Sequence, residues 1–423
     1  MRPEVELLLC CSGTSIDAVR AERIRTLLRT DFNWTSLLKT ADRHGVLPLL
    51  NRTLRTISSI DVPQAILEQL QHHSRANAAR NLFLTDELLK LLTLFEAHNI
   101  PALPYKGPLL TATLYGNLAG RDFADLDLLV HEPDYERAQG LLSTSGYRLM
   151  NAFEWESTYL NGTGRVTVDL HRRMTSREFP SPLQFEQAWE RRQHTVLLGT
   201  QVPTLSAEDT LLMLAVQITK DAGAPYLQLS RICDIAQLLS GHPDLDLTEV
   251  LRQASGLGGE RMVLFSLSLT HSLLGTPLPH EILGEVRANP TIEGLVEFAR
   301  QQLFDDRDAS ARDQHSIDQF RWLVRERLRD KLLPYYLRYM YDVLVPCSLD
   351  RQLVPLPQHL SFLYYGIRPI RLVCKYGLLL CGRRLERNVP EDGFTSYKSP
   401  LGRNGNLGEI VDPETSRKPP HAP

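Results

Sequence analysis

The spacing of hydrophobic residues changes along the chain, and each change predicts a different kind of structure. In the first hundred residues, apolar side chains recur every three or four positions, which is the period of an amphipathic helix. The clearest stripe consists of Leu84, Leu88, Leu91, Leu92 and Phe95. Thr85 and Asp86 lie near its expected start. The pattern predicts a helical N-terminal lobe over residues 1–96.

From residue 97 to residue 205 the period shortens to two in places, which is typical of strands. In the run 121–130, Phe123, Asp125 and Asp127 alternate with apolar residues that face the opposite way. In the run 165–171, Asp169 and His171 alternate with aliphatic residues in the same manner. We therefore expect two strands, each with one apolar face and one acidic face.

Prolines and glycines divide the rest of this middle region. Pro101 and Pro104 predict that residues 100–106 form an edge strand or an irregular strand. A helix is expected over 108–115, closed by Gly116, and another over 133–145, ended by Gly146.

After Ser206 the pattern is helical almost to the end. Ser206 followed by Asp209 resembles a capping arrangement. Further helices are expected over 226–240, 246–256, 259–274, 291–304 and 316–344. The sequence thus predicts an α+β fold with a small mixed-sheet core at 97–205 and a C-terminal helical lobe at 206–387. Residues 388–423, rich in Pro, Gly, Ser and charge, are expected to form a disordered tail.

Composition limits the expected partners and the expected cellular location of the protein. A net charge of -3 over 423 residues excludes a globally basic nucleic-acid binder. The six cysteines are scattered and form no CxxC pair, which favours a reducing, cytoplasmic location. The apolar run 360–381 is interrupted by charged residues and a proline, so no transmembrane segment is expected.

The two predicted strands carry the candidate chemistry. Asp125 and Asp127, two positions apart, point to the same side of one strand, and Asp169 has the matching orientation on the other. Clustered carboxylates repel one another unless a cation neutralises them, and hard oxygen ligands suit Mg²⁺, with Mn²⁺ as an alternative. Three such ligands predict a two-metal site of the kind that activates an attacking oxygen and stabilises a leaving group.

A D-x-D pair alone is weak evidence for a metal site, because such pairs occur by chance on surface strands. Its surroundings strengthen it: Lys106-Gly107 precedes a predicted helix whose first amide groups can hold phosphate oxygens. An ordinary strand-to-helix turn is the alternative interpretation of that pair, and a solvated lysine is the alternative for Lys106.

A family resemblance rests on these residues together. The chain contains Lys106-Gly107, then Leu114-Tyr115-Gly116, then Arg121-Asp122-Phe123-Ala124-Asp125-Leu126-Asp127-Leu128-Leu129-Val130. This order resembles the uncharacterised bacterial nucleotidyltransferase family of the polymerase-beta-like nucleotidyltransferase superfamily. The resemblance covers about residues 30 to 380. It implies that Gly107 marks the nucleotide-binding turn, that Asp125 and Asp127 are metal ligands, and that Asp169 is the third carboxylate.

The sequence departs from the family pattern at three places. Pro101 and Pro104 stand where smooth aliphatic residues are usual, which puts the pairing of that strand in doubt. Gln217 stands where a His is common, a difference that bears on how the acceptor is bound. Tyr105 precedes Lys106 where Leu is commoner.

Other polar residues admit two interpretations each. Arg121 is predicted either to bind the nucleotide triphosphate or to pair with Asp122 or another acid. His171 is predicted either to contact the substrate or the carboxylates that support the metal ligands, or to be a structural histidine. Asp122 is expected at the surface or as a cap, and Asp234 as an intrahelical partner of Arg231.

The stretch Arg368–Arg387 contains six basic residues and one acid, with Tyr376 inside it and Tyr364 and Tyr365 just before it. Such a stretch could hold RNA or an anionic surface. An amphipathic helix that packs its apolar face on the protein is the favoured interpretation.

The resulting expectation is a Mg²⁺-dependent nucleotidyltransferase. It would move a nucleoside monophosphate from an NTP to an unidentified acceptor, which is a small molecule, a peptide or sugar intermediate, or an RNA end, and release pyrophosphate. RNA is not the favoured partner. The alternative is a catalytically silent protein that keeps the fold to bind a nucleotide or a partner.

Overall fold

The computed structural model describes residues 2–13, 16–30, 32–57, 61–176, 179, 183–224, 226–305, 314–332, 336 and 362–380. Residues 1–339 form one compact unit, and residues 340–423 belong to a second. In the second unit the structure describes one helix, α18 (Tyr364–Leu380). The expected tail at 388–423 lies outside the described residues.

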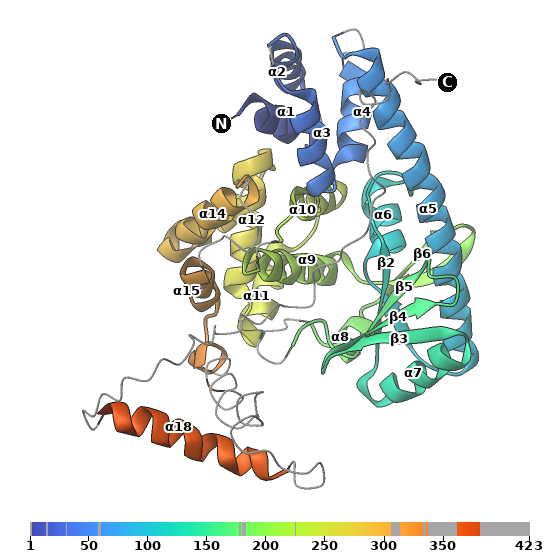
Figure 1. Cartoon of the computed structure of the whole chain (residues 1–423). Helices are drawn as coiled ribbons and strands as arrows, with labels where there is room; N and C mark the ends of the chain where they lie inside the picture. The colour runs from blue at the N-terminus through green and yellow to red at the C-terminus, as the bar shows by residue number, and fades with distance from the viewer. Residues whose placement is uncertain are drawn as a thin grey trace, which may run out of the picture. The chain divides into compact units, whose positions relative to one another are not determined.

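Among the described residues, five helices precede the sheet (Figure 1): α1 (Pro3–Cys11), α2 (Ala18–Leu28), α3 (Trp34–Arg43), α4 (Leu47–Ile57) and α5 (Gln64–Ala97). The expectation of a helix start near Thr85 was wrong, because α5 begins at Gln64. Thr85 is fully buried inside that helix, and its hydroxyl donates to the Asn81 carbonyl 2.6 Å away. Because this hydroxyl is hydrogen-bonded to the preceding turn of the same helix, it does not cap a helix N-terminus.

The central sheet contains β1 (Ala102–Pro104), β2 (Asp125–Val130), β3 (Tyr147–Ala152), β4 (Glu156–Asn161) and β5 (Thr167–His171), in the order β1-β2-β5-β4-β3. The β2–β5 pairing is parallel, and the other pairings are antiparallel. The mixed sheet is therefore confirmed. β1 lies at an edge, as expected from Pro104 within it and Pro101 directly before it. β2 begins at Asp125, four residues later than predicted, and β3 and β4 were not predicted.

One face of the sheet packs on α5 and on α7 (Tyr135–Thr144), which follows a 3₁₀ turn at Glu132–Asp134. Leu126, Leu128 and Val130 contribute to that core. Phe123 also joins it, so its predicted position on the Asp125 side was wrong, because it lies before the strand begins. α6 (Gly107–Tyr115) ends at Gly116 in the left-handed conformation, as predicted.

Downstream lie α8 (Phe185–Glu190) and a separate hairpin of β6 (Gln193–Leu197) and β7 (Thr200–Thr204). The C-terminal helices of this unit are α9 (Ala207–Ala222), α10 (Leu229–Gly241), α11 (Leu247–Leu257), α12 (Glu260–Leu274), α13 (His280–Ala288), α14 (Pro290–Leu303) and α15 (Gln314–Val324). Ser206 caps α9 by accepting a hydrogen bond from the Asp209 amide, as predicted. These helices share one hydrophobic core with α1 to α4.

The prediction of a single helix over 316–344 was wrong. α15 ends at Val324, where the Arg261 guanidinium donates to the carbonyl oxygens of Leu323 and Arg325. A tertiary donor thus takes carbonyls that a continuing helix would have used.

The division of the chain into lobes at residues 96, 205 and 387 stays a prediction. Within the described residues, no helix has the length and apolarity needed to cross a membrane.

Candidate functional site

The three predicted carboxylates lie on adjacent parallel strands. In the register between β2 and β5, Asp127 is paired with Asp169, and Asp125 is paired with Thr167. Because alternate residues of a strand point to the same face, Asp125, Asp127 and Asp169 share the sheet face opposite the α5 and α7 core. We call these three residues the carboxylate cluster. Asp127 is 6% exposed, whereas Asp125 and Asp169 are half-buried.

Lys106 and Gly107 place the start of α6 beside this cluster. Gly107 has φ +56°, and a Cβ built there would lie 3.0 Å from the Asp125 carbonyl oxygen. Only glycine combines this left-handed conformation with so close an approach. Lys106 precedes it, and its Nζ lies 3.1 Å from Asp127 Oδ1. The ammonium predicted to contact phosphate is thus held by a carboxylate of the cluster.

His171 contacts the cluster from the end of β5. Its Nε2 lies 3.2 Å from Asp127 Oδ1, and its Nδ1 lies 3.3 Å from Glu156 Oε2. The His171 and Tyr105 rings meet in a T-shaped arrangement, with a centroid distance of 5.4 Å. Burial raises the pKa of the Asp127 carboxyl, but Lys106 and His171 outweigh burial and hold that pKa well below its usual range. Asp127 is therefore ionised at neutral pH.

Two residues near the cluster were missed from the sequence, and the first is Glu156. It begins β4 and is paired with His171 in the register. No hydrophobic pattern marks this strand in the sequence, because β4 buries Ser157 and Tyr159 rather than a run of aliphatic side chains.

The second missed residue is Lys220, near the end of α9. Burial lowers the pKa of this half-buried ammonium and Lys106 lowers it further, whereas Glu156 and Asp127 act to raise it. Lys220 is therefore coupled electrostatically to Lys106, Glu156 and Asp127. Gln217, one turn earlier on α9, donates a hydrogen bond of 2.8 Å to Asp221 Oδ1.

Arg121 does not lie free to meet a phosphate. Its Nε lies 3.0 Å from both carboxylate oxygens of Asp234 on α10, and both residues are buried. Tyr115 donates a hydrogen bond of 2.8 Å to the same carboxylate. The pairing of Asp234 with Arg231 was wrong, because Arg231 instead lies 3.6 Å from Asp221. Of the two interpretations of Arg121, the observed contact is the one with another acid.

Asparagine side chains of α5 fix the backbone at the same point. The side-chain amides of Asn77 and Asn81 donate to the Arg121 carbonyl at 3.2 and 2.9 Å. Asp122, the next residue, lies 3.3 Å from His73 Nε2 and is partly buried. The segment that leads into Asp125 is thus held from α5, α6 and α10.

The chemistry of the donor set fits a divalent cation such as Mg²⁺. Three carboxylates supply hard oxygen ligands, and Asp127 already binds a cation, the Lys106 ammonium. As the side chains stand, no group of three His, Cys, Asp or Glu residues within the described part of the chain encloses a metal position. A metal ion bound to Asp127 would share that carboxylate with the Lys106 ammonium, which contacts Oδ1.

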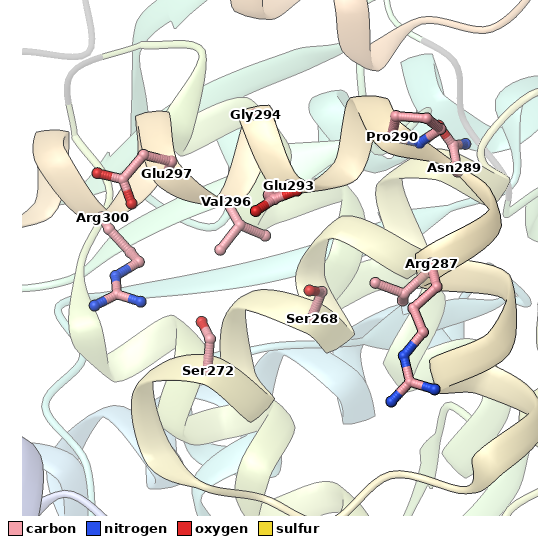
Figure 2. Close-up of a pocket in the computed structure, with 11 residues that line it drawn as sticks. Ser268, Ser272, Arg287, Asn289, Pro290, Glu293, Gly294, Val296, Glu297 and Arg300 are labelled. Atoms are coloured by element: carbon pink, nitrogen blue, oxygen red, sulfur yellow. The ribbon is translucent and has the colours of Figure 1, made fainter.

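A cavity of about 630 Å³ lies apart from these strands, on α12, α13 and α14. Figure 2 shows Ser268 and Ser272 on one wall, with Glu297 and Arg300 across from them and Arg287 at the other end. It contains none of the predicted site residues.

Comparison with known proteins bears on this site. The sequence profile described as "Uncharacterised nucleotidyltransferase" matches residues 30–275, more than half of the chain. The chain belongs to this family. The family predicted from the Lys106-to-Val130 motif is thus confirmed, and the matched residues include the whole carboxylate cluster. No curated protein matches the sequence.

Three solved structures resemble parts of this family member. The lincosamide antibiotic adenylyltransferase LnuA with bound lincomycin is 20% identical, over 37% of this chain and 96% of that chain, with a TM-score of 0.29. ANT(2")-Ia in complex with adenylyl-2"-tobramycin is 14% identical, over 41% and 95%, with a TM-score of 0.32. An antigenic nucleotidyltransferase-like protein from Paracoccidioides brasiliensis is 16% identical, over 50% and 97%, with a TM-score of 0.27.

Proposed function

We propose that this family member transfers a nucleoside monophosphate from an NTP to an acceptor, with the carboxylate cluster as its Mg²⁺ site. The observation that carries the proposal is the register that sets Asp127 beside Asp169, with the glycine-initiated α6 next to Asp125. In the reaction, an acceptor nucleophile forms a bond to the α-phosphorus, and the bond to the bridging oxygen breaks. Pyrophosphate leaves with that electron pair, and any acceptor proton passes to solvent.

The residues have distinct roles in this proposal. Asp125, Asp127 and Asp169 hold the metal, which when bound would polarise the reacting phosphate and neutralise the leaving group. The first amide groups of α6 point toward phosphate oxygens, as helix N-termini do. Lys106 moves from Asp127 to the triphosphate, and Lys220 binds the same anion from α9. His171, whose Nδ1 lies 3.3 Å from Glu156, keeps Asp127 ionised and oriented through its contact with Asp127 Oδ1.

A metal requirement for nucleotide binding tests the first half of this proposal. Isothermal titration with ATP or GTP should give measurable affinity in Mg²⁺ and much weaker affinity in excess EDTA. Mg²⁺ should also weaken the hold of Asp127 on Lys106, since both cations use one carboxylate. Equal affinity in the two buffers would rule out the metal site.

Transfer itself is tested with each of the four NTPs, labelled at the α-phosphate, together with Mg²⁺ and candidate acceptors. Mass spectrometry should detect an acceptor that has gained a nucleoside monophosphate, and the reaction should release pyrophosphate. An RNA acceptor predicts a steep loss of activity with salt, whereas a small-molecule acceptor does not.

One observation favours a second candidate, a nucleotide-binding protein without turnover. Asp127 Oδ1 is already in contact with both Lys106 and His171, so the cluster satisfies part of its charge without metal. Such a protein would bind NTP without releasing pyrophosphate, and Asp125→Asn would leave its NTP affinity unchanged.

A further inference from the structure

Large apolar side chains stand exposed in the described part of the second unit. Phe362, just before α18, is 65% exposed, Tyr365 is 56% exposed, and Ile370 is 66% exposed. We call residues 362–380 the α18 segment. A short helix that presents aliphatic and aromatic side chains to solvent needs an apolar environment to cover them.

The charge of this region is as distinctive as its apolar surface. From residue 351 to residue 385 the sequence contains no Asp or Glu, although the whole chain carries a net charge of -3. The basic residues in that stretch are Arg351, Arg368, Arg371, Lys375, Arg383 and Arg384. A purely positive stretch in an otherwise slightly acidic protein is complementary to an anionic surface.

We propose that the α18 segment binds the surface of an anionic lipid bilayer. The helix carries Arg368, Arg371 and Lys375 among its 17 described residues, and Pro369 lies inside it, so it is too charged to span a bilayer. A helix with basic residues and large apolar residues instead lies in the interface, where the apolar side chains enter the acyl boundary and the basic ones meet the headgroups. RNA is disfavoured as the partner, because Ile370, the most exposed of these side chains, offers RNA neither a charge, nor a hydrogen bond, nor a ring on which a base can stack.

The test uses the full chain and vesicles in a flotation assay. We expect the protein to float with vesicles that contain phosphatidylserine and to stay behind with vesicles of phosphatidylcholine alone. Raising the salt concentration should release it, because the headgroup attraction is screened. Equal flotation with both vesicle types, or none with either, would overturn the proposal.

Two variants separate the charge contribution from the apolar contribution. Arg368→Gln with Arg371→Gln should weaken partitioning by about 25-fold, or about fivefold for each charge. Ile370→Ser should weaken it by about tenfold. Val19→Ser is the matched apolar control, because Val19 is 81% exposed on α2, and Arg300→Gln is the control for an exposed arginine.

Neither control should change partitioning, and melting curves of all variants should coincide with that of the wild type. A control that weakens flotation as much as its partner variant would contradict the assignment to α18. If a labelled single-stranded RNA binds instead, is lost in the arginine variant and is kept in Ile370→Ser, the partner is a nucleic acid and the lipid proposal fails.

Discussion

The buried pair that includes Arg121 and the carboxylate cluster that includes Asp125 lie close together in the sequence but differ in their balance of charge. Arg121 and Asp234 form a buried pair in which the two charges match and Tyr115 adds a hydrogen bond. The carboxylate cluster has three acids, and the Lys106 ammonium contacts one of them, Asp127. A matched buried pair fixes structure, whereas excess charge of one sign attracts a ligand. The comparison therefore separates a structural half of the motif from a chemical half.

The largest expected effect is on transfer by the carboxylate cluster. Asp125→Asn should lower turnover about 10³-fold, because a preorganised electrostatic contribution to phosphoryl transfer is lost. Its melting temperature should stay near that of the wild type, since less repulsion remains in the apo site. Asp127→Asn should lose as much activity and also some stability, because Lys106 and His171 lose their partner.

Asp169→Asn should behave like Asp125→Asn, with a smaller loss of activity. Turnover and a melting curve are measured for each variant. Full activity in both Asp125→Asn and Asp127→Asn would place the active site elsewhere, and unfolding of Asp125→Asn would make that residue structural.

Breaking the buried pair should have the opposite signature. Arg121→Gln should lower the free energy of unfolding by about 3 kcal/mol, because the Asp234 charge is left buried without its partner. The double variant Arg121→Met with Asp234→Leu should recover much of that loss, since no charge remains to desolvate. Urea denaturation gives both values. If the single variant is as stable as the wild type but fails to bind NTP, Arg121 contacts phosphate after all.

A variant of Lys220 tests whether α9 contributes to the NTP site beside the carboxylate cluster. Lys220→Met should weaken NTP binding about tenfold, because one charge-assisted contact to the triphosphate is lost. Stability should not fall, since burial already disfavours the charged form of Lys220. Lys90→Met, at a side chain that is 64% exposed on α5, is the matched control and should leave affinity unchanged. Equal affinity in wild type and Lys220→Met would remove α9 from the site.

The smallest effect concerns Asp122, which lies between the two groups in sequence and belongs to neither. Its hydrogen bond raises the pKa of His73, so the pair contributes stability fully below the unfolded histidine pKa of about 6.5. That contribution, under about 1 kcal/mol, is lost as the pH rises through the folded pKa. Asp122→Asn should thus lower the melting temperature at pH 5 more than at pH 9, with activity near wild type. A pH-independent difference would contradict the pairing.

The sequence by itself determined the strands that carry the acids and the turn that precedes them. Alternation of polar and apolar residues placed Asp125 and Asp127 on one face of a strand, because the side-chain period of a strand is two. Pro101 and Pro104 predicted an edge strand, and Gly116 predicted a helix end, because both residue types restrict or permit particular backbone angles. These are local properties, and they need no distant partner.

The tertiary structure alone decided which charges meet. Arg121 and Asp234 are 113 positions apart, and Lys220 reaches the charges around Asp127 from a different helix. β3 was missed because it is an edge strand whose side chains after Tyr147 are exposed, so it shows no apolar alternation. A residue's role as a ligand or a structural ion depends on what the fold brings beside it, and hydrophobic periodicity carries no information about that.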